Sequence, residues 1–339
     1  MIKGWADMHK NIPTEENIMY MTKLSPFSVR TIWGGRKLID NYGIKTDLEN
    51  CAEAWMLSCF ENFESTVAQG EYAGKTLTQV IAECSKDILG KNAANFEYFP
   101  ILIKFIDAAD DLSVQVHPDD EYAAQYNGGY GKTECWYIMD CEPGARIIYG
   151  FKDKISTEEF AKAIEENRID DVVNYVEVKK GDFFLIEAGT LHAICKGILL
   201  AEVQQNSNVT FRAYDYNRFD AKCNGPRPLH IKETLDVTKC EPPCPSIPTL
   251  TKVEQLDGAV RTELVSFELF SVNKVEISGT YTSSADENSF VHIMVLDGNG
   301  TISCGDVSFD ITKGEGVFVP AAAGEYTVNG TITVLESRV

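Results

Sequence analysis

The sequence predicts a mainly β protein built from two jelly-roll units with a few short helices. After residue 261 the chain consists of short apolar runs separated by turn pairs such as Asn-Gly at 329–330, a spacing typical of a β-sandwich or jelly roll. Residues 112–118 alternate between apolar and polar side chains, as a half-buried strand does. The motif at 180–192 consists of Lys-Gly-Asp, an apolar run, a turn and a histidine, and a shorter version of it occurs at 313–321. This repeat indicates two units of one plan, and only the first keeps the histidine.

The length of the chain and one proline-rich segment predict the division into domains. A chain of 339 residues is long enough for two domains. Four prolines fall within residues 240–248, a composition typical of an extended linker. The predicted parts are an N-terminal arm at 1–23, a first jelly-roll unit carrying the candidate site at 24–240, a linker at 241–260 and a C-terminal jelly roll at 261–339.

Composition and charge limit the classes of partner and the compartment. The formal net charge of −20 argues against nucleic acid or an anionic membrane as partner, and a phosphate ligand would need a local cluster of basic residues. The chain has no apolar run of about 18 residues and its first residues lack the apolar core of a signal peptide, so we expect no membrane span and a cytoplasmic protein. The ten cysteines are scattered without a Cys-x-x-Cys pair, which favours ordinary thiols over a structural zinc site.

Two segments have helical spacing. Apolar residues recur at helical intervals in residues 76–89, with Thr76 as a candidate N-cap and Gly90 as a stop. Residues 157–167 place apolar side chains on one face and charged side chains on the other. We therefore predict two short helices in the first unit.

Two predicted strands carry charged residues in apolar surroundings. Residues 98–106 form an apolar run interrupted by Lys104, and a buried ammonium needs a partner. The alternating run at 51–58 places Glu53 and Trp55 on one face. Glu53 is either part of a pocket wall or an exposed strand residue.

Four residues on three β-segments could bind a divalent metal. Gln115 and His117 project from one face of the strand at 112–118, Glu134 follows a Gly-rich bend, and His192 is the last residue of the 180–192 motif. Two imidazoles, a carboxylate and an amide oxygen suit a divalent metal with open positions. A single Gln or His on a strand is more often an ordinary polar residue, so spacing alone leaves both interpretations open. The other histidines, at 9, 230 and 292, lack an equivalent setting and are not expected to be ligands.

Two further cations lie in segments near these residues. Lys132 precedes Glu134 by two positions and shares its face if the strand extends that far. Arg212 lies in an alternating strand; it either pairs with Asp215 on the outer face or points inward, where it would hold phosphate or developing negative charge.

Several segments together resemble class I mannose-6-phosphate isomerase (phosphomannose isomerase) in its short bacterial form. The resemblance runs from about Leu24 to the C-terminus, and its most specific parts are FPILIKFIDAADDLSVQVHPDD and the Gly-Lys-Thr-Glu sequence ending at Glu134. The segments that carry it are 32–35, 52–55, 99–120, 131–137, 188–193 and 204–215.

The resemblance implies two cupin-type jelly rolls, with one zinc ion per chain in the first. The implied zinc ligands are Gln115, His117, Glu134 and His192. The implied catalytic residues are Arg212, Lys132 and Glu53, and the candidate substrate-binding residues are Lys104, Ser113, Trp33 and Asn208. Only 58 positions separate Glu134 from His192, so the helical insertion of longer family members is expected to be absent.

The implied activity is interconversion of mannose 6-phosphate and fructose 6-phosphate through a cis-enediol. Zinc would orient and polarise the O1 and O2 oxygens, while Arg212 and Lys132 would stabilise negative charge. The general base stays open between Glu53, Lys132 and a zinc-bound hydroxide. Relatives commonly have Asp where this chain has Asn208, and Asn cannot act as a base. Two alternatives are a non-catalytic sugar-phosphate-binding cupin and an Fe(II) cupin dioxygenase. The sequence predicts no oligomeric state.

Overall fold

The protein is described here by a computed structural model covering residues 19–339. The expected N-terminal arm, 1–23, lies outside the described residues except for residues 19–23, as does His9. Strands dominate and helices are few and short, so the prediction of a mainly β protein is confirmed. No helix in the described part of the chain is long and apolar enough to cross a membrane.

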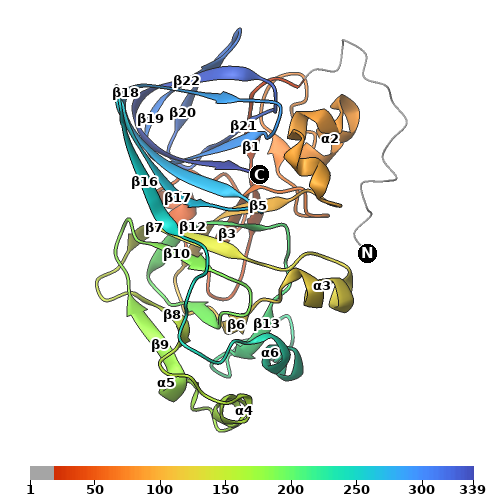
Figure 1. Ribbon diagram of the computed structural model, residues 1–339, viewed down its shortest axis with the longest axis vertical. Coiled ribbons are helices and arrows are strands. Elements are labelled where there is room, and N and C mark those ends of the chain that lie inside the picture. Colours follow the sequence, from red (N-terminus) through yellow and green to blue (C-terminus); the bar gives the residue numbers. More distant parts are fainter. Residues whose placement is uncertain (1–18) are drawn as a thin grey trace.

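Three large antiparallel sheets and one two-stranded hairpin make up the described part of the molecule (Figure 1). The C-terminal sheet contains β1 (Thr22–Ser25), β4 (Thr66–Val67), β16 (Thr249–Leu256), β17 (Ala259–Ser266), β18 (Ser271–Ala285), β19 (Val291–Cys304), β20 (Val307–Thr312), β21 (Gly316–Val319) and β22 (Gly324–Arg338). The central sheet contains β2 (Phe27–Val29), β3 (Glu53–Leu57), β5 (Ile101–Ala108), β7 (Glu134–Cys141), β10 (Phe183–Ile186) and β12 (Ile198–Gln205). The distal sheet contains β6 (Val114–Val116), β8 (Arg146–Phe151), β9 (Val173–Glu177), β11 (His192–Ile194) and β13 (Phe211–Tyr214).

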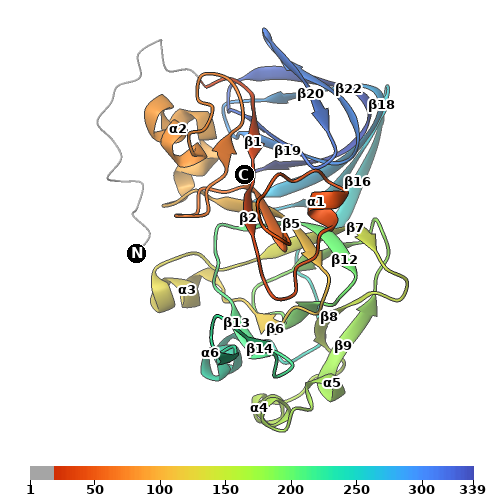
Figure 2. The ribbon, with the colours of Figure 1, turned by 180° about the vertical axis from the view of Figure 1, so that it is seen from behind.

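The remaining elements lie around the outside of these sheets (Figure 2). They are the small hairpin β14 (Phe219–Asp220) and β15 (Gly225–Pro226), the 3-10 turns Lys86–Leu89 and Asn92–Asn95, and the helices α1 (Lys37–Asp40), α2 (Leu77–Cys84), α3 (Asp120–Asn127), α4 (Thr157–Glu165), α5 (Ile169–Val172) and α6 (Ile231–Val237). The prediction for residues 76–89 is confirmed in detail: Thr76 caps α2 in a capping box with Gln79, and a 3-10 turn ends before Gly90. Among the described residues the longest helix, α4, has nine residues, which agrees with the expected absence of a large helical insertion.

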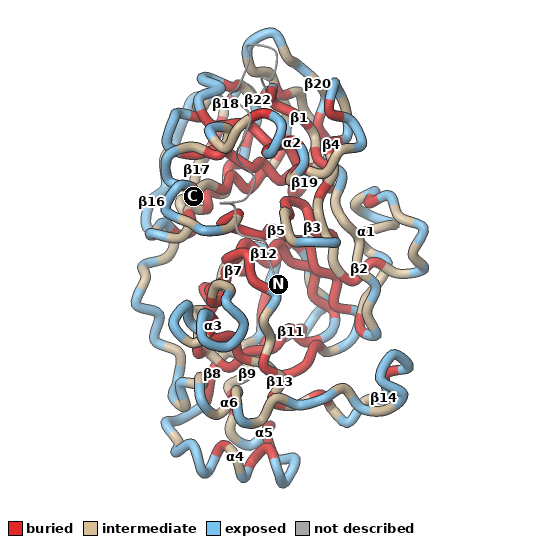
Figure 3. Tube along the Cα trace, turned by 90° about the vertical axis from the view of Figure 1, so that its right-hand side faces the viewer, coloured by how far each residue is buried: buried red, intermediate tan, exposed pale blue. Residues whose placement is uncertain are grey.

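The central sheet lies between the other two sheets and is buried on both faces (Figures 1 and 3). One face packs on the C-terminal sheet; Ile103 of β5 and Val203 of β12 share a core with Phe318 of β21. The other face packs on the distal sheet, where Trp136 and Ile147 belong to one cluster. Because both faces are covered, β12 is buried along its whole length. The polar residues described below lie on the face toward the distal sheet.

The C-terminal sheet contains strands from both ends of the described sequence. β1 pairs with β21, so Thr22–Ser25 belongs to the same sheet as the C-terminal strands. β16 occupies residues 249–256, within the segment assigned from sequence to the linker, and pairs with β17. The domain boundaries themselves stay a prediction.

Candidate active site

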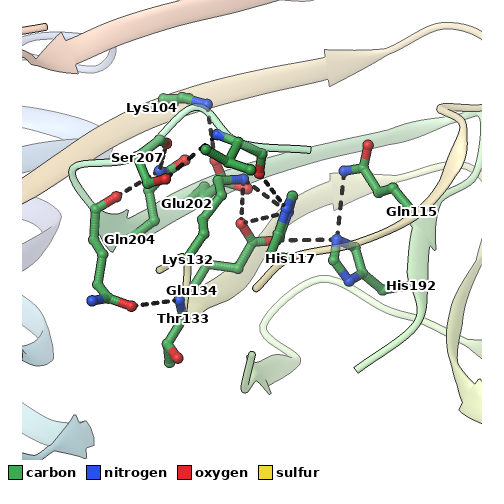
Figure 4. A network of polar contacts seen from close by, with 12 residues as sticks. Lys104, Gln115, His117, Lys132, Thr133, Glu134, His192, Glu202, Gln204 and Ser207 are labelled. Atoms are coloured by element: carbon green, nitrogen blue, oxygen red, sulfur yellow. Dashed lines mark hydrogen bonds and ion pairs between the residues drawn. The ribbon is translucent and has the colours of Figure 1, made fainter. Parts of the chain in front are cut away.

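Two histidines and one glutamate converge between the central and distal sheets (Figure 4). Each of His117, Glu134 and His192 offers a ligand atom, and these atoms all lie within 4.8 Å of one another. The His117 Nε2–Glu134 Oε2 distance is 3.5 Å and the His192 Nε2–Glu134 Oε1 distance is 3.6 Å. All three side chains are buried. The structure thus brings together three of the four residues expected to bind metal, and their role as ligands stays a prediction.

Backbone carbonyls fix both imidazole rings. Nδ1 of His117 lies 2.8 Å from the carbonyl oxygen of Val209, and Nδ1 of His192 lies 2.8 Å from that of Thr190. A carbonyl oxygen can only accept, so each Nδ1 carries the proton and each Nε2 presents its lone pair to the site. This is the arrangement in which histidine binds a metal through Nε2.

The register of the distal sheet aligns Gln115 with His192 and with Arg212. His192 is the strand partner of Gln115 in β6, and Gln115 is the partner of Arg212 in β13. Directly opposed residues point to the same face, so the three side chains form a row. The Gln115 amide nitrogen lies 3.4 Å from His192 Nε2, and Ser113 Oγ donates to the Gln115 amide oxygen at 3.3 Å. The role of Gln115 as a ligand stays a prediction.

The bend before β7 places Lys132 beside the same cluster. Lys132 Nζ donates to Glu134 Oε2 at 2.6 Å and lies 3.0 Å from His117 Nε2. Gly131 permits this bend, since a Cβ there would come within 2.5 Å of the backbone carbon of Asp119. β7 begins at Glu134, so the strand does not extend back to Lys132, and it is the bend rather than strand alternation that brings the two side chains together.

The electrostatics of the cluster favour a cation. Burial, together with the nearby Glu202 carboxylate, raises the pKa of Glu134 to about 7. Burial lowers the pKa of His192 to about 4, and burial with the neighbouring Lys132 charge lowers that of His117 well below its usual value. Glu134 Oε1 is buried and has no hydrogen-bond partner within residues 19–339. Two neutral imidazoles around an unsatisfied carboxylate oxygen fit a divalent metal ion.

A second set of buried charges lies on the same face of the central sheet. Lys104 Nζ lies 3.3 Å from Glu202 Oε1 and 3.4 Å from Glu53 Oε2. Burial lowers the pKa of Lys104, but the two carboxylates outweigh it and the pKa is raised to about 12. Trp55 Nε1 donates to Glu53 at 2.7 Å and Trp136 Nε1 donates to Glu202 at 3.0 Å, so the lysine is held between two carboxylates that are themselves fixed. The expected partner for Lys104 is therefore present.

Arginines form a third polar group at β13 and the loop after it. Asp215 accepts hydrogen bonds from Arg227 Nε at 2.7 Å and from Arg218 Nη2 at 2.6 Å. One interpretation of the sequence paired Asp215 with Arg212, but Arg218 and Arg227 take that place. Arg212 Nη1 instead donates to the Pro228 carbonyl at 2.8 Å. Its Nε is buried without a hydrogen-bond partner in the described chain. Arg212 thus retains a free donor beside Gln115.

The other candidate residues lie in different settings. Ser113 is buried next to Gln115, whereas Asn208 is exposed in the loop between β12 and β13. Trp33 is buried in the apolar cluster that also contains Trp136. Their assignment to substrate binding, like that of Lys104, stays a prediction. Of the histidines set aside from sequence, His230 accepts a hydrogen bond from the Arg212 backbone N–H at 3.1 Å.

Sequence reasoning missed Glu202. It is 3% exposed and lies within the apolar run of β12, paired in register with Lys104. The signal that singled out Lys104, a charge inside an apolar strand, applies equally to Glu202.

Comparisons with known proteins agree with this geometry. Residues 21–146 match the family "Phosphomannose isomerase type I, catalytic domain", and residues 260–339 match "Mannose-6-phosphate isomerase, cupin domain". The chain is 40% identical over 308 residues to mannose-6-phosphate isomerase ManA of Bacillus subtilis, a match covering 90% of this chain and 94% of that protein. This chain belongs to the type I mannose-6-phosphate isomerase family.

Another relative and a solved structure are comparably similar. Mannose-6-phosphate isomerase of Streptococcus mutans is 36% identical over 309 residues, covering 91% of this chain and 95% of that protein. The crystal structure of the mannose 6-phosphate isomerase from Bacillus subtilis superimposes with a TM-score of 0.87 at 35% identity, covering 95% of this chain and all of that one. The prediction of family and of a two-unit cupin fold is confirmed.

Proposed function

We propose that this protein is a zinc-dependent aldose–ketose isomerase that interconverts mannose 6-phosphate and fructose 6-phosphate. The observation that carries the proposal is the buried cluster of His117, Glu134 and His192, with one Glu134 oxygen unsatisfied, in a chain of this family. The reaction moves a proton between C1 and C2 and passes through an enediol, so it needs a base near carbon and positive charge near oxygen.

The donor set supports one zinc ion per chain. His117 and His192 would bind through Nε2 and Glu134 through a carboxylate oxygen, with Gln115 as the fourth ligand if its amide oxygen faces the ion. Bound zinc would supply Lewis acidity toward the O1 and O2 oxygens of the sugar. The protein would supply the rest of the chemistry.

The surrounding cations suit an anionic substrate in a chain of net charge −20. Lys132 lies at the cluster and would stabilise negative charge on the enediol oxygens. Arg212 keeps an unsatisfied Nε and lies in register with Gln115, a position suited to phosphate or to an oxyanion. Arg218 and Arg227 are paired with Asp215, and Arg218 also with Asp110, so their charges are compensated.

The general base is proposed to be one of three side chains. Glu53 and Glu202 are carboxylates on the site face of the central sheet, and both are bound to Lys104. Lys132 is the third, since it already lies at hydrogen-bond distance from two cluster residues. Asn208, exposed and without a basic group, is not a candidate. Localisation in the cytoplasm stays a prediction.

A coupled assay tests the proposal. Purified protein is given mannose 6-phosphate, and fructose 6-phosphate is followed before and after chelation and with zinc added back. Turnover that a chelator abolishes and zinc restores is the expected result. Saturable binding of mannose 6-phosphate without turnover would instead favour a sugar-phosphate sensor, and oxygen consumption with ferrous iron would favour a dioxygenase.

A further inference from the structure

β16 is a long open edge of the C-terminal sheet. It is the first strand in the order β16-β17-β18-β22-β19-β21-β1-β4, and it pairs with β17 on one side. The strand at the opposite end, β4, has two residues, whereas β16 has eight. Figure 3 shows β16 at the outside of the molecule, largely in the colour of exposed residues. A strand edge of this length offers unpaired backbone groups to another chain.

β16 also exposes apolar side chains. Leu250, Val253 and Leu256 are 55%, 60% and 43% exposed. Within the described chain, large apolar residues are exposed at only eight positions, so three of them share one short strand. Val253 and Leu256 are three positions apart and so point to opposite faces of the strand, which leaves Val253 as the exposed apolar residue at the middle of the free edge.

The turn into β17 determines which residues of β16 point their backbone N–H and C=O groups toward the open edge. Leu256 and Ala259 flank the two-residue turn at 257–258 and form the first pair of the hairpin. Hydrogen-bonded pairs alternate along an antiparallel ladder, so Leu256, Glu254 and Lys252 bond to β17. The backbone groups of Val253 and Gln255 then point to the open edge.

The sequence of this edge is complementary to itself. When two copies of β16 lie antiparallel with Val253 opposite Val253, Lys252 of each copy lies opposite Glu254 of the other, and Thr251 lies opposite Gln255. Val253 then exchanges backbone hydrogen bonds with its equivalent across a twofold axis, which is the pairing that the outward-pointing groups require.

We propose that the protein forms a twofold dimer through β16, centred on Val253, so that two C-terminal sheets become one continuous sheet. The partner is a second copy of this chain. Main-chain hydrogen bonds hold the strands together, Val253 packs on its equivalent, and the two Lys252–Glu254 pairs fix the register.

The charges on β16 select this register against others. Lysine on an edge strand ordinarily opposes pairing with other strands. Within one copy Lys252 Nζ lies 2.5 Å from Glu254 Oε1, and Glu254 also lies 3.3 Å from Arg261 on β17. In the dimer each Lys252 remains opposite a carboxylate, whereas a shift of two residues along the strand would break both charge pairs. Leu250, with a φ of 53°, lies where the β16–β17 register shifts and so limits the paired length.

Sedimentation velocity on the full chain tests the proposal with two charge reversals. The measurement is made near physiological salt, where screening over about 8 Å limits the repulsion between two chains of net charge −20. The unsubstituted protein is expected to sediment as a dimer in equilibrium with monomer. Lys252→Glu puts glutamate opposite Glu254 in both pairs, and Glu254→Lys puts lysine opposite Lys252. Each variant alone is expected to be monomeric.

An equimolar mixture of the two variants provides the decisive sample. A heterodimer of Lys252→Glu with Glu254→Lys has opposite charges in both pairs, so the dimer is expected to return on mixing. This return also shows that both variants are folded, and each is expected to keep the unsubstituted turnover. Three results would each overturn the proposal: a monomer throughout the concentration range for the unsubstituted chain, a dimer that neither reversal weakens, or variants that stay monomeric when mixed.

Discussion

The Lys132 ammonium donates to Oε2 of Glu134 at 2.6 Å, while Oε1 of the same carboxylate has no hydrogen-bond partner in residues 19–339. One carboxylate therefore holds a protein cation on one oxygen and offers the other to the space beside His192. Lys132 also lies 3.0 Å from His117 Nε2, so a single ammonium contacts two of the candidate metal ligands. If the cluster binds a metal and Lys132 contacts substrate as proposed, Glu134 links the two.

Glu134→Ala is expected to abolish both metal binding and turnover. The substitution removes the one anionic ligand of the cluster and leaves Lys132 near two neutral imidazoles. The loss of turnover should exceed the roughly 10–100-fold that loss of an outer hydrogen-bond partner costs. Metal content by atomic absorption and turnover in the coupled assay are compared with Glu177→Ala, a control at an exposed glutamate on β9. Stoichiometric zinc retained in Glu134→Ala would show that Glu134 is not a ligand.

Arg212→Ala is expected to retain metal and lose turnover. Arg212 lies in register with Gln115 but not in the His117–Glu134–His192 cluster, so its loss leaves that cluster intact. Removing one group that stabilises developing charge costs on the order of 10²–10³-fold in turnover. Arg168→Ala, at an exposed arginine after α4, serves as the matched control. Near-normal turnover in Arg212→Ala would exclude a catalytic role for this residue.

Strand periodicity is sufficient to predict part of the site. In β6 the alternation of Val114 and Val116 with Gln115 matches a strand with one apolar and one polar face, and the structure has that pattern. Here the local pattern and the final environment agree. Lys132 reaches Glu134 by another route, because it lies in the bend before β7 and not in the strand.

Periodicity fails where a strand is covered on both sides. β12 packs Val203 toward the C-terminal sheet and Leu200 toward the distal sheet, so both faces are apolar and the run shows no alternation. Glu202 within it is stabilised by Lys104 and Trp136, which come from other strands. The Asp215 pairing is likewise a tertiary property, because Arg227 reaches it across the β14–β15 hairpin. Such partners are set by packing rather than by nearby residues.

Gly131→Ala is expected to lower turnover and stability together. An added Cβ would lie 2.5 Å from the backbone carbon of Asp119, so the bend that carries Lys132 must move. Overpacking of this kind costs about 1–3 kcal/mol. Gly129→Ala in the same bend is the control, since its Cβ would meet only the Asn127 side chain, at 3.2 Å. Turnover and the midpoint of thermal unfolding are measured for both, and equal effects of the two substitutions would contradict the prediction.

His292 of β19 is expected to make the protein less stable in mild acid. The side chain is fully buried, and neither ring nitrogen has a hydrogen-bond partner in the described chain. Burial lowers its pKa from 6.5 to about 3. Between these values the unfolded chain binds a proton that the folded protein does not, so the free energy of unfolding falls as the pH falls through this window. Above about pH 6.5 the residue contributes no pH dependence.

His292→Leu removes this titration and keeps an apolar side chain of similar size. The difference in unfolding free energy between the variant and the unsubstituted protein should grow in favour of the variant by about 1.4 kcal/mol per pH unit below pH 6. Comparing the two proteins by urea unfolding at pH 7, 6 and 5 cancels the contributions of the His117–Glu134–His192 cluster, which both retain. A difference that stays constant across this range would mean that His292 also takes up its proton in the folded protein. Water would then have to supply the hydrogen-bond partners that both ring nitrogens lack.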